Sequence, residues 1–259
     1  MDSTEDLTVL VTGASGFIGT VICQGLLSSG VNLTLLTRRP LDLGAGIQQH
    51  IFAGLKGIEP ERKWFDGVDI VVHLAARVHQ MNADPENEAS LQMTENCDAT
   101  LKLAAMAAKC GVKQFIYLST IKVNGEHTDG IAPFSETDAP APKDAYGLSK
   151  WEAEQGLNVL ASSSALVTTI IRSPLVYGPN VKANFKALLS LSVKGLPLPL
   201  ASINNNRSII SVDNLASFLI HCCANKKAYN QLFLAADNPP LSTPALVRLM
   251  ASSQGKSVS

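Results

Sequence analysis

A glycine-rich turn between a predicted strand and a predicted helix is the feature that most constrains the fold of this chain. Residues 7–12 are apolar and β-rich, as in a strand buried on both faces, and residues 18–29 follow with helical spacing of their apolar side chains. Between them, Gly13, Gly16 and Gly19 form the pattern G-x-x-G-x-x-G. Positions without side chains let the backbone approach a pyrophosphate at the positive helix N-terminus. The pattern therefore predicts dinucleotide binding; the alternative is a tight turn with no ligand.

Strands and helices are predicted to alternate along the first two thirds of the chain. Further strands are expected at residues 31–37, 69–74, 114–119 and 167–172, and helices at residues 94–109 and 145–160. This alternation implies crossover connections between parallel strands. The predicted fold class is therefore α/β, with a doubly wound parallel sheet of the Rossmann type and a small C-terminal substrate lobe.

Two domains are expected, because the pattern becomes less regular in the last third of the chain. Residues 1–172 are predicted to form an NAD(P)-binding Rossmann domain, and residues 173–259 a smaller substrate-binding lobe. In this lobe, helices are expected at 212–224 and 242–251. A strand near residues 231–235 is expected to return to the sheet.

Composition and charge exclude several classes of protein. The 259 residues include 21 Lys and Arg against 22 Asp and Glu, without a basic stripe, which argues against a nucleic-acid-binding protein. No apolar run is long enough to predict a membrane span, and the acidic N-terminus is the reverse of a secretory signal. The five cysteines lack C-x-x-C spacing and predict free thiols, with no metal site. A soluble, cytoplasmic protein is expected.

The end of the second predicted strand bears on the choice of dinucleotide. An acid about 20 residues after the glycine loop hydrogen-bonds the ribose 2′-hydroxyl of NAD in dinucleotide-binding folds. Here the strand ends in Thr37, Arg38 and Arg39, without an acid. Two guanidinium groups at this edge favour the 2′-phosphate of NADP over NAD, while the alternative is a solvated basic turn.

An acid/base pair is predicted at the start of the helix over residues 145–160. Tyr146 and Lys150 lie four residues apart, on one face of this helix, and Asp144 is a candidate N-cap. Lowering the pKa of a tyrosine from about 10 to neutrality requires roughly 4 kcal/mol, to which a neighbouring ammonium contributes. Such a pair also occurs by chance. Thr120, after Ser119 at the end of a predicted strand, adds a hydroxyl that can bind a substrate oxygen.

These motifs, in this order, resemble those of the extended short-chain dehydrogenase/reductase family, also called the NAD-dependent epimerase/dehydratase family. Further matching segments are His73–Ala76, Asn96, Phe115–Thr120, Ile171–Pro179 and Arg207–Asp213. Within the family, the chain is similar to nucleotide-sugar 4-epimerases and 4-keto-sugar reductases. The segment Thr120–Gly125 resembles the subgroup found in bacterial polysaccharide synthesis.

The resemblance implies a role for each matching residue. The catalytic residues would be Thr120, Tyr146 and Lys150. The cofactor would be bound by Gly13, Ser15, Gly16, Phe17, Ile18, Gly19, Thr37, Arg38, Arg39, Leu74, Ala75, Ala76, Asn96, Ser119, Tyr146, Lys150, Pro174 and Val176. Thr120, Asn184 and Arg207 would bind the substrate; the alternatives are that Asn184 is a helix N-cap and Arg207 a surface cation.

The sequence also departs from the family pattern at three places. The NAD-binding acid is absent at Thr37, and the aspartate that usually contacts adenine is replaced around residues 53–55. The C-terminal lobe is expected to be shortened. His73 is expected to be structural.

The function implied is hydride transfer at C4 of a UDP-sugar. A 4-keto-sugar reductase that uses NADPH is slightly favoured; the alternatives are a 4-epimerase with tightly bound NAD and a non-catalytic NADP-binding regulator. A dehydratase is disfavoured, because Ile121 and Lys122 stand where family dehydratases have an Asp-Glu pair. The resemblance also implies a homodimer formed through the helices at 94–109 and 145–160.

Overall fold

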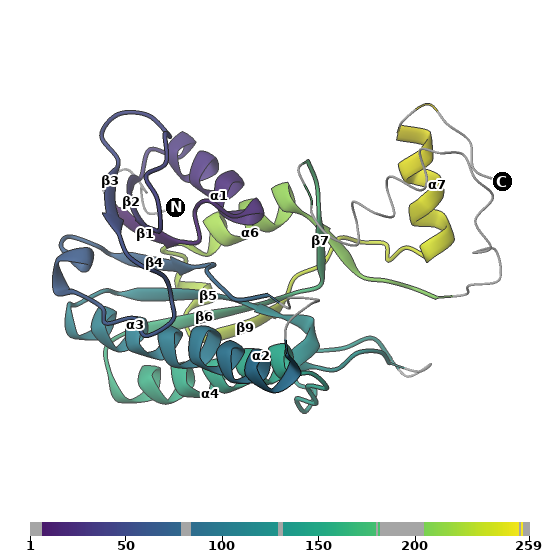
Figure 1. Cartoon of the computed structure of the whole chain (residues 1–259). Coiled ribbons are helices and arrows are strands. Elements are labelled where there is room, and N and C mark those ends of the chain that lie inside the picture. Colours follow the sequence, from purple (N-terminus) through teal and green to yellow (C-terminus); the bar gives the residue numbers. More distant parts are fainter. Residues whose placement is uncertain are drawn as a thin grey trace. The chain divides into compact units, whose positions relative to one another are not determined.

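Seven parallel strands form the central sheet of the protein (Figure 1). The structure is a computed structural model that describes residues 7–78, 84–128, 132–179, 181, 205–253 and 255. The strand order is β3 (Gln48–Ile51), β2 (Asn32–Thr37), β1 (Thr8–Thr12), β4 (Ile70–His73), β5 (Gln114–Thr120), β6 (Val167–Ser173) and β9 (Gln231–Leu234). All six neighbouring pairs are parallel. The chain winds outward from β1 in both directions, which confirms the predicted doubly wound sheet.

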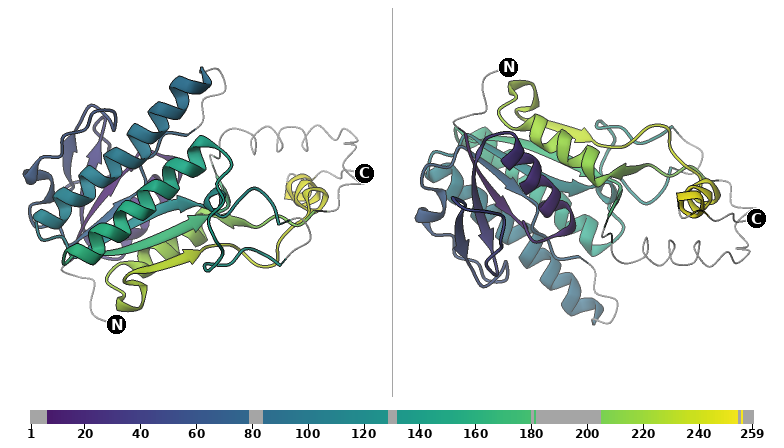
Figure 2. Two further views of the ribbon diagram at one scale, coloured as in Figure 1. Left: turned by 90° about the horizontal axis from the view of Figure 1, so that it is seen from below. Right: turned by 90° about the horizontal axis from the view of Figure 1, so that it is seen from above.

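Helices cover both faces of this sheet (Figure 2). One face carries α1 (Phe17–Ser28) and α6 (Val212–Cys222); the other carries α2 (Pro85–Gln92), α3 (Ala99–Lys109) and α4 (Ala145–Ser163). Glycines allow the close approaches: a Cβ at Gly25 of α1 would lie 2.5 Å from Ile220 Cδ1 of α6, and one at Gly156 of α4 would lie 2.5 Å from Leu101 Cδ2 of α3. A large apolar cluster fills the space between the sheet and the helices α3 and α4.

The helix predicted at residues 94–109 begins as a π-helical turn. This turn covers Met93–Asp98 and joins α2 to α3. A π turn inserts an extra residue into a helix and is frequent at functional sites. Here it carries the buried Asn96.

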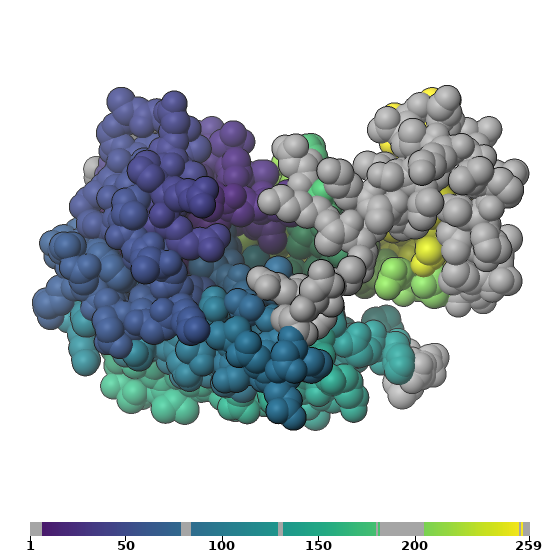
Figure 3. Space-filling model, viewed as in Figure 1, coloured from purple at the N-terminus to yellow at the C-terminus, as the bar shows by residue number. Residues whose placement is uncertain are grey.

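The chain divides into two compact units, whose described residues are coloured along the sequence in Figure 3. The larger consists of Met1–Ser173 with Ala216–Leu234, and the smaller of Pro174–Leu215 with Ala235–Ser259. The smaller unit contains the parallel pair β7 (Leu175–Tyr177) and β8 (Ile209–Ser211), and helix α7 (Thr243–Ser253). No helix in the described part of the chain is long and apolar enough to cross a membrane.

Candidate active site

The turn between β1 and α1 has the shape of a cradle for a phosphate group. Gly13 has a φ of +75°, and a Cβ there would lie 2.7 Å from the backbone nitrogen of Ala75. A Cβ at Gly19 would lie 2.2 Å from the Gly13 carbonyl oxygen. Gly16 is the N-cap of α1 and has no side chain to accept from the first turn, so backbone N–H groups remain available to an anion. The turn fits the pyrophosphate of a dinucleotide.

A cavity of about 530 Å³ lies beside this turn, at the carboxyl ends of β1, β2 and β4. Doubly wound sheets bind ligands at this position, where the strand order reverses. The predicted cofactor residues that line the cavity are Gly13, Ser15, Gly16, Thr37, Arg38, Leu74, Ala75 and Ala76. The structure therefore brings together residues from three separate parts of the sequence.

The part of this cavity beyond β2 is cationic. Arg38 and Lys56 both line it, and the Arg38 side chain passes Gly54, with its Cδ 3.8 Å from where a Cβ would stand. Glu95 is the one acid among the described lining residues, and it forms an ion pair with Arg77 at 3.2 Å. No described carboxylate therefore lines the cavity at the end of β2.

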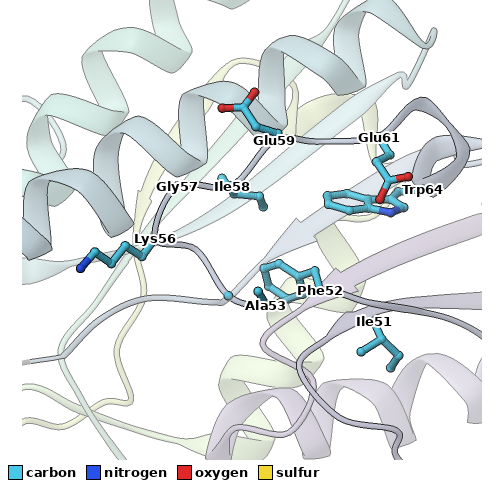
Figure 4. Close-up of a pocket in the computed structure, with 10 residues that line it drawn as sticks. Ile51, Phe52, Ala53, Lys56, Gly57, Ile58, Glu59, Glu61 and Trp64 are labelled. Carbon is cyan, nitrogen blue, oxygen red and sulfur yellow. The ribbon is translucent and has the colours of Figure 1, made fainter.

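A second cavity of about 300 Å³ adjoins the first. The two share Phe52, Ala53, Gly54 and Lys56 as lining residues. Figure 4 shows Phe52 facing Trp64 in this second cavity, and their rings meet edge-on with centroids 6.2 Å apart. Ala53 and Gly54, in the segment where the family's adenine-contacting aspartate is expected to be replaced, therefore border both cavities.

The first turn of α4 brings the predicted acid/base residues to the end of β5. Asp144 caps this helix, its Oδ1 accepting from the Gly147 N–H at 2.7 Å. A Cβ at Gly147 would lie only 3.0 Å from the Lys122 carbonyl oxygen, so the turn approaches the segment after Thr120 closely. Thr120 is the last residue of β5, is 9% exposed and accepts from the Lys122 N–H.

Lys150 is almost fully buried one turn further along α4. Its Nζ lies 4.2 Å from the centre of the Tyr117 ring, within cation–π distance. Burial lowers the pKa of Lys150 to about 7, and the charge of Glu154 opposes this shift. Burial, followed by the charge of Asp144, raises the pKa of Tyr146 to about 12. The protein's own groups therefore keep Tyr146 protonated at neutral pH, as a proton donor.

Asn96 connects the cavity to the acid/base helix. Its Oδ1 accepts from the Arg77 N–H at 2.7 Å, and its Nδ2 donates to the Arg77 carbonyl at 3.0 Å and to Ser149 Oγ at 3.1 Å. Ser149 in turn donates to the Tyr146 carbonyl at 2.8 Å. These partners use every donor of the amide, so Asn96 positions the cavity wall against α4. Its direct contact with a cofactor stays a prediction.

The His73 ring lies between the buried hydroxyls of Thr12 and Thr100, and the directions of these hydrogen bonds determine which ring nitrogen carries the proton. Thr100 Oγ1 donates to the Asn96 carbonyl at 2.7 Å, so it accepts from His73 Nε2 at 2.9 Å. His73 Nδ1 then accepts from Thr12 Oγ1 at 2.7 Å, and that oxygen accepts from the Ala75 N–H at 3.2 Å. Burial, followed by the charge of Lys150, lowers the pKa of His73 to about 3. The neutral imidazole supports the cavity wall.

A neutral buried histidine makes stability depend on pH. The unfolded chain protonates His73 near pH 6.5 and the folded protein only near pH 3, so stability falls as the pH drops through this range. At pH 5 the loss from this group is about 2 kcal/mol. Urea unfolding at pH 7 and pH 5 should show a smaller pH effect in His73→Gln than in the wild type. The exposed His221→Gln is the control, and parallel behaviour of all three proteins would contradict the prediction.

Comparison with known proteins identifies the family. The family model "NAD dependent epimerase/dehydratase family" matches residues 9–233. The chain belongs to the NAD-dependent epimerase/dehydratase family. Its members are enzymes of the extended short-chain dehydrogenase/reductase type, as the sequence predicts, and this enzyme shares their nicotinamide-dinucleotide-binding fold.

Individual relatives are epimerases by name. The chain is 39% identical to the UDP-glucose 4-epimerase of Vibrio cholerae over 246 residues, which cover 94% of this chain and 75% of the relative. It is 28% identical to an N-acetyl-α-D-glucosaminyl-diphospho-ditrans,octacis-undecaprenol 4-epimerase of Escherichia coli O157:H7, covering 96% of this chain and 73% of the relative. The structure of UDP-glucuronic acid 4-epimerase from Bacillus cereus with NAD shares the fold, with a TM-score of 0.84 at 23% identity over 98% of this chain and 86% of that one.

In the larger unit of this epimerase/dehydratase family member, the predicted residues Phe17, Ile18, Gly19 and Arg39 do not line the cavity. Arg39 is exposed, and its carbonyl accepts from the Thr37 hydroxyl at 2.9 Å. Phe17, Ile18 and Gly19 belong to the first turn of α1. Pro174, Val176 and Arg207 belong to the smaller unit, where the Arg207 backbone bridges to Leu241. Asn184 lies outside the described residues.

Four charged residues at the site were missed by the sequence analysis. Arg77, Lys56 and Glu95 line the cavity, and Glu154 contacts Ser119. Arg77 directly follows the His73–Ala76 segment, and Glu154 lies one further helical turn after Lys150. Both spacings were visible in the sequence, whereas Lys56 lies in a loop without a motif.

Proposed function

We propose that this enzyme interconverts UDP-sugars that differ in configuration at C4, by removing and returning a hydride there. The main support is the acid/base helix of Tyr146 and Lys150, set against the hydroxyl that ends β5, in a chain 39% identical to a UDP-glucose 4-epimerase. The cavity at the glycine turn supports a bound dinucleotide.

Each site residue has a defined task in this reaction. The Thr120 hydroxyl binds the oxygen on C4 and aligns it with Tyr146. Tyr146 Oη takes the proton of the 4-hydroxyl as C4 loses hydride, and returns the proton when the 4-keto group is reduced on the opposite face. Tyr146 must be a phenolate before it takes this proton and is one again after returning it, and protonated Lys150 stabilises that phenolate. When bound, the dinucleotide supplies a hydride acceptor whose oxidised ring adds positive charge.

Substrate binding is proposed for the smaller unit. Arg207 is exposed there and can bind a diphosphate through charge-assisted hydrogen bonds. We propose the same role for Asn184 and a cofactor contact for Pro174 and Val176. With a net charge of −1, the chain has no global field to attract the diphosphate, so local cations must do so.

The test is to incubate the purified protein with UDP-glucose, UDP-galactose and their N-acetylated and uronic acid counterparts. Conversion of one C4 epimer into the other, without net consumption of a nicotinamide cofactor, is the expected result. Tightly bound dinucleotide released by denaturation would also support it. No conversion of any pair, with or without added NAD or NADP, would overturn the proposal.

A second candidate is a 4-keto-sugar reductase that takes NADPH from solution. The observation that favours it is the cationic cavity end formed by Arg38 and Lys56, without a described carboxylate. Loss of NADPH absorbance with a UDP-4-keto-6-deoxy sugar would support the reductase. In that case purified protein should contain no bound dinucleotide.

The choice between NADP and NAD depends on Arg38. Arg38→Ala is expected to weaken NADP binding about 10- to 100-fold, which corresponds to a charge-assisted hydrogen bond of about 1.5–3 kcal/mol, and to leave NAD binding nearly unchanged. Calorimetric titration with each dinucleotide measures this. Arg39→Ala is the matched control, because Arg39 does not line the cavity. Equal weakening of NAD and NADP binding by Arg38→Ala would contradict NADP preference.

A further inference from the structure

Glu154 forms a buried cluster one helical turn after Lys150 on α4. Its side chain is 1% exposed and accepts hydrogen bonds from two neighbouring strands. Ser119 Oγ of β5 donates at 2.5 Å, and Arg172 of β6 donates through Nη2 at 2.6 Å and through Nε at 3.1 and 3.2 Å. Since Glu154 belongs to α4, one carboxylate joins this helix to the ends of both strands.

The partners of Glu154 are themselves fixed in place. Arg172 Nη1 donates to Asn124 Oδ1 at 2.8 Å, and Asn124 Nδ2 donates to the Ser135 carbonyl at 3.0 Å. Ser119 directly precedes Thr120. The carboxylate therefore sets the distance between the strand that ends in Thr120 and the helix that carries the acid/base pair.

Glu154 also lies one helical turn from Lys150, on the same face of α4. The titratable groups around Lys150 are His73 from β4, Tyr117 from β5, and Tyr146 and Glu154 one helical turn away on α4. Arg172 from β6 joins this cluster through its ion pair with Glu154. His73 is neutral near pH 7 and burial raises the pKa of Tyr117, so neither carries a charge. Arg172 is positive, and Glu154 is the group whose charge favours the Lys150 ammonium.

We propose that Glu154 is a positioning residue for proton transfer, whose carboxylate keeps the buried Lys150 protonated and aligns the end of β5 with the acid/base helix. Moving an ammonium group from water into the protein interior costs free energy unless an opposite charge nearby compensates it. Glu154 provides that compensation. This inference rests on the roles proposed above for Tyr146 and Lys150.

The test separates the charge of Glu154 from its structural role. Glu154→Gln and Arg172→Gln break the same ion pair, but they remove charges of opposite sign. In protein labelled with ¹³C at lysine Cε, the Lys150 signal reports its protonation, and its loss in Lys150→Arg assigns it. Glu154→Gln should lower the midpoint of the Lys150 titration by about one pH unit, whereas Arg172→Gln should not lower it. The alkaline limb of the kcat profile should move with the midpoint.

A merely structural ion pair predicts equal behaviour of the two variants. A midpoint that is unchanged in Glu154→Gln, or lowered alike in both variants, would overturn the proposal. If unpaired Arg172 prevents Glu154→Gln from folding, the double variant Glu154→Gln/Arg172→Gln replaces it, and its midpoint should lie below that of Arg172→Gln. The NMR titration needs no substrate, so it can succeed even where UDP-sugar turnover fails.

Discussion

Replacing Tyr146 with phenylalanine is expected to lower kcat about 1,000-fold, within the range that general acid/base catalysis contributes. The variant keeps the ring that packs at the start of α4 and loses only the hydroxyl that carries the proton. The structure keeps this hydroxyl protonated at neutral pH, because burial and Asp144 raise its pKa to about 12. Steady-state turnover of the UDP-sugar that the wild type converts measures the effect.

Binding and folding should be nearly unaffected by this substitution. Dinucleotide affinity and the midpoint of thermal unfolding are the controls. Tyr229→Phe is the matched variant, since Tyr229 follows a short turn beside the amino end of β6, whereas Tyr146 lies near the carboxyl end of β5. A kcat within tenfold of the wild type in Tyr146→Phe would contradict its role as the proton donor. The site would then need another acid.

Gly19→Ala is the second substitution for which a large effect is expected. Its Cβ would stand 2.2 Å from the carbonyl oxygen of Gly13 and 2.8 Å from the Cα of Ala14, and both are backbone atoms that cannot rotate away. The glycine turn must shift, so we expect about 3 kcal/mol lower stability and loss of measurable dinucleotide binding. Urea unfolding and a dinucleotide titration measure the two effects.

Gly30→Ala is the matched control for this substitution. Gly30 has a φ of +77°, but nothing lies within 4 Å of the added Cβ. The cost is therefore backbone strain alone, about 1 kcal/mol, with dinucleotide binding retained. Wild-type dinucleotide affinity in Gly19→Ala would show that the turn does not hold the pyrophosphate.

The central strands could be predicted from the sequence because they are buried on both faces. Residues 8–12, 70–73 and 114–120 form apolar runs that only an interior strand needs. The edge strand β3 was missed, because its residues Gln48–Ile51 are largely polar and part-exposed. The polar helix α2 was missed for a similar reason, since it has no apolar stripe.

The candidate site, too, has a part that could be predicted from local sequence and a part that depends on contacts between distant residues. The glycine turn and the pair of Tyr146 and Lys150 are local in sequence, and their chemistry depends on spacing alone. The contact of Glu154 with Arg172 joins residues 18 apart, and that of Asn96 with Ser149 joins residues 53 apart. Sequence spacing does not reveal such contacts, because they depend on how α4 packs on the strands.

The π-helical turn at Met93–Asp98 makes the length of this helical segment critical. Each residue of a helix turns the chain by about 100°, so the loss of one residue there would rotate α2 against α3. Asn96 would then face away from Arg77 and Ser149, and the cavity wall would lose its link to the acid/base helix. Insertions or deletions in this region are therefore compatible with the site only outside the π turn.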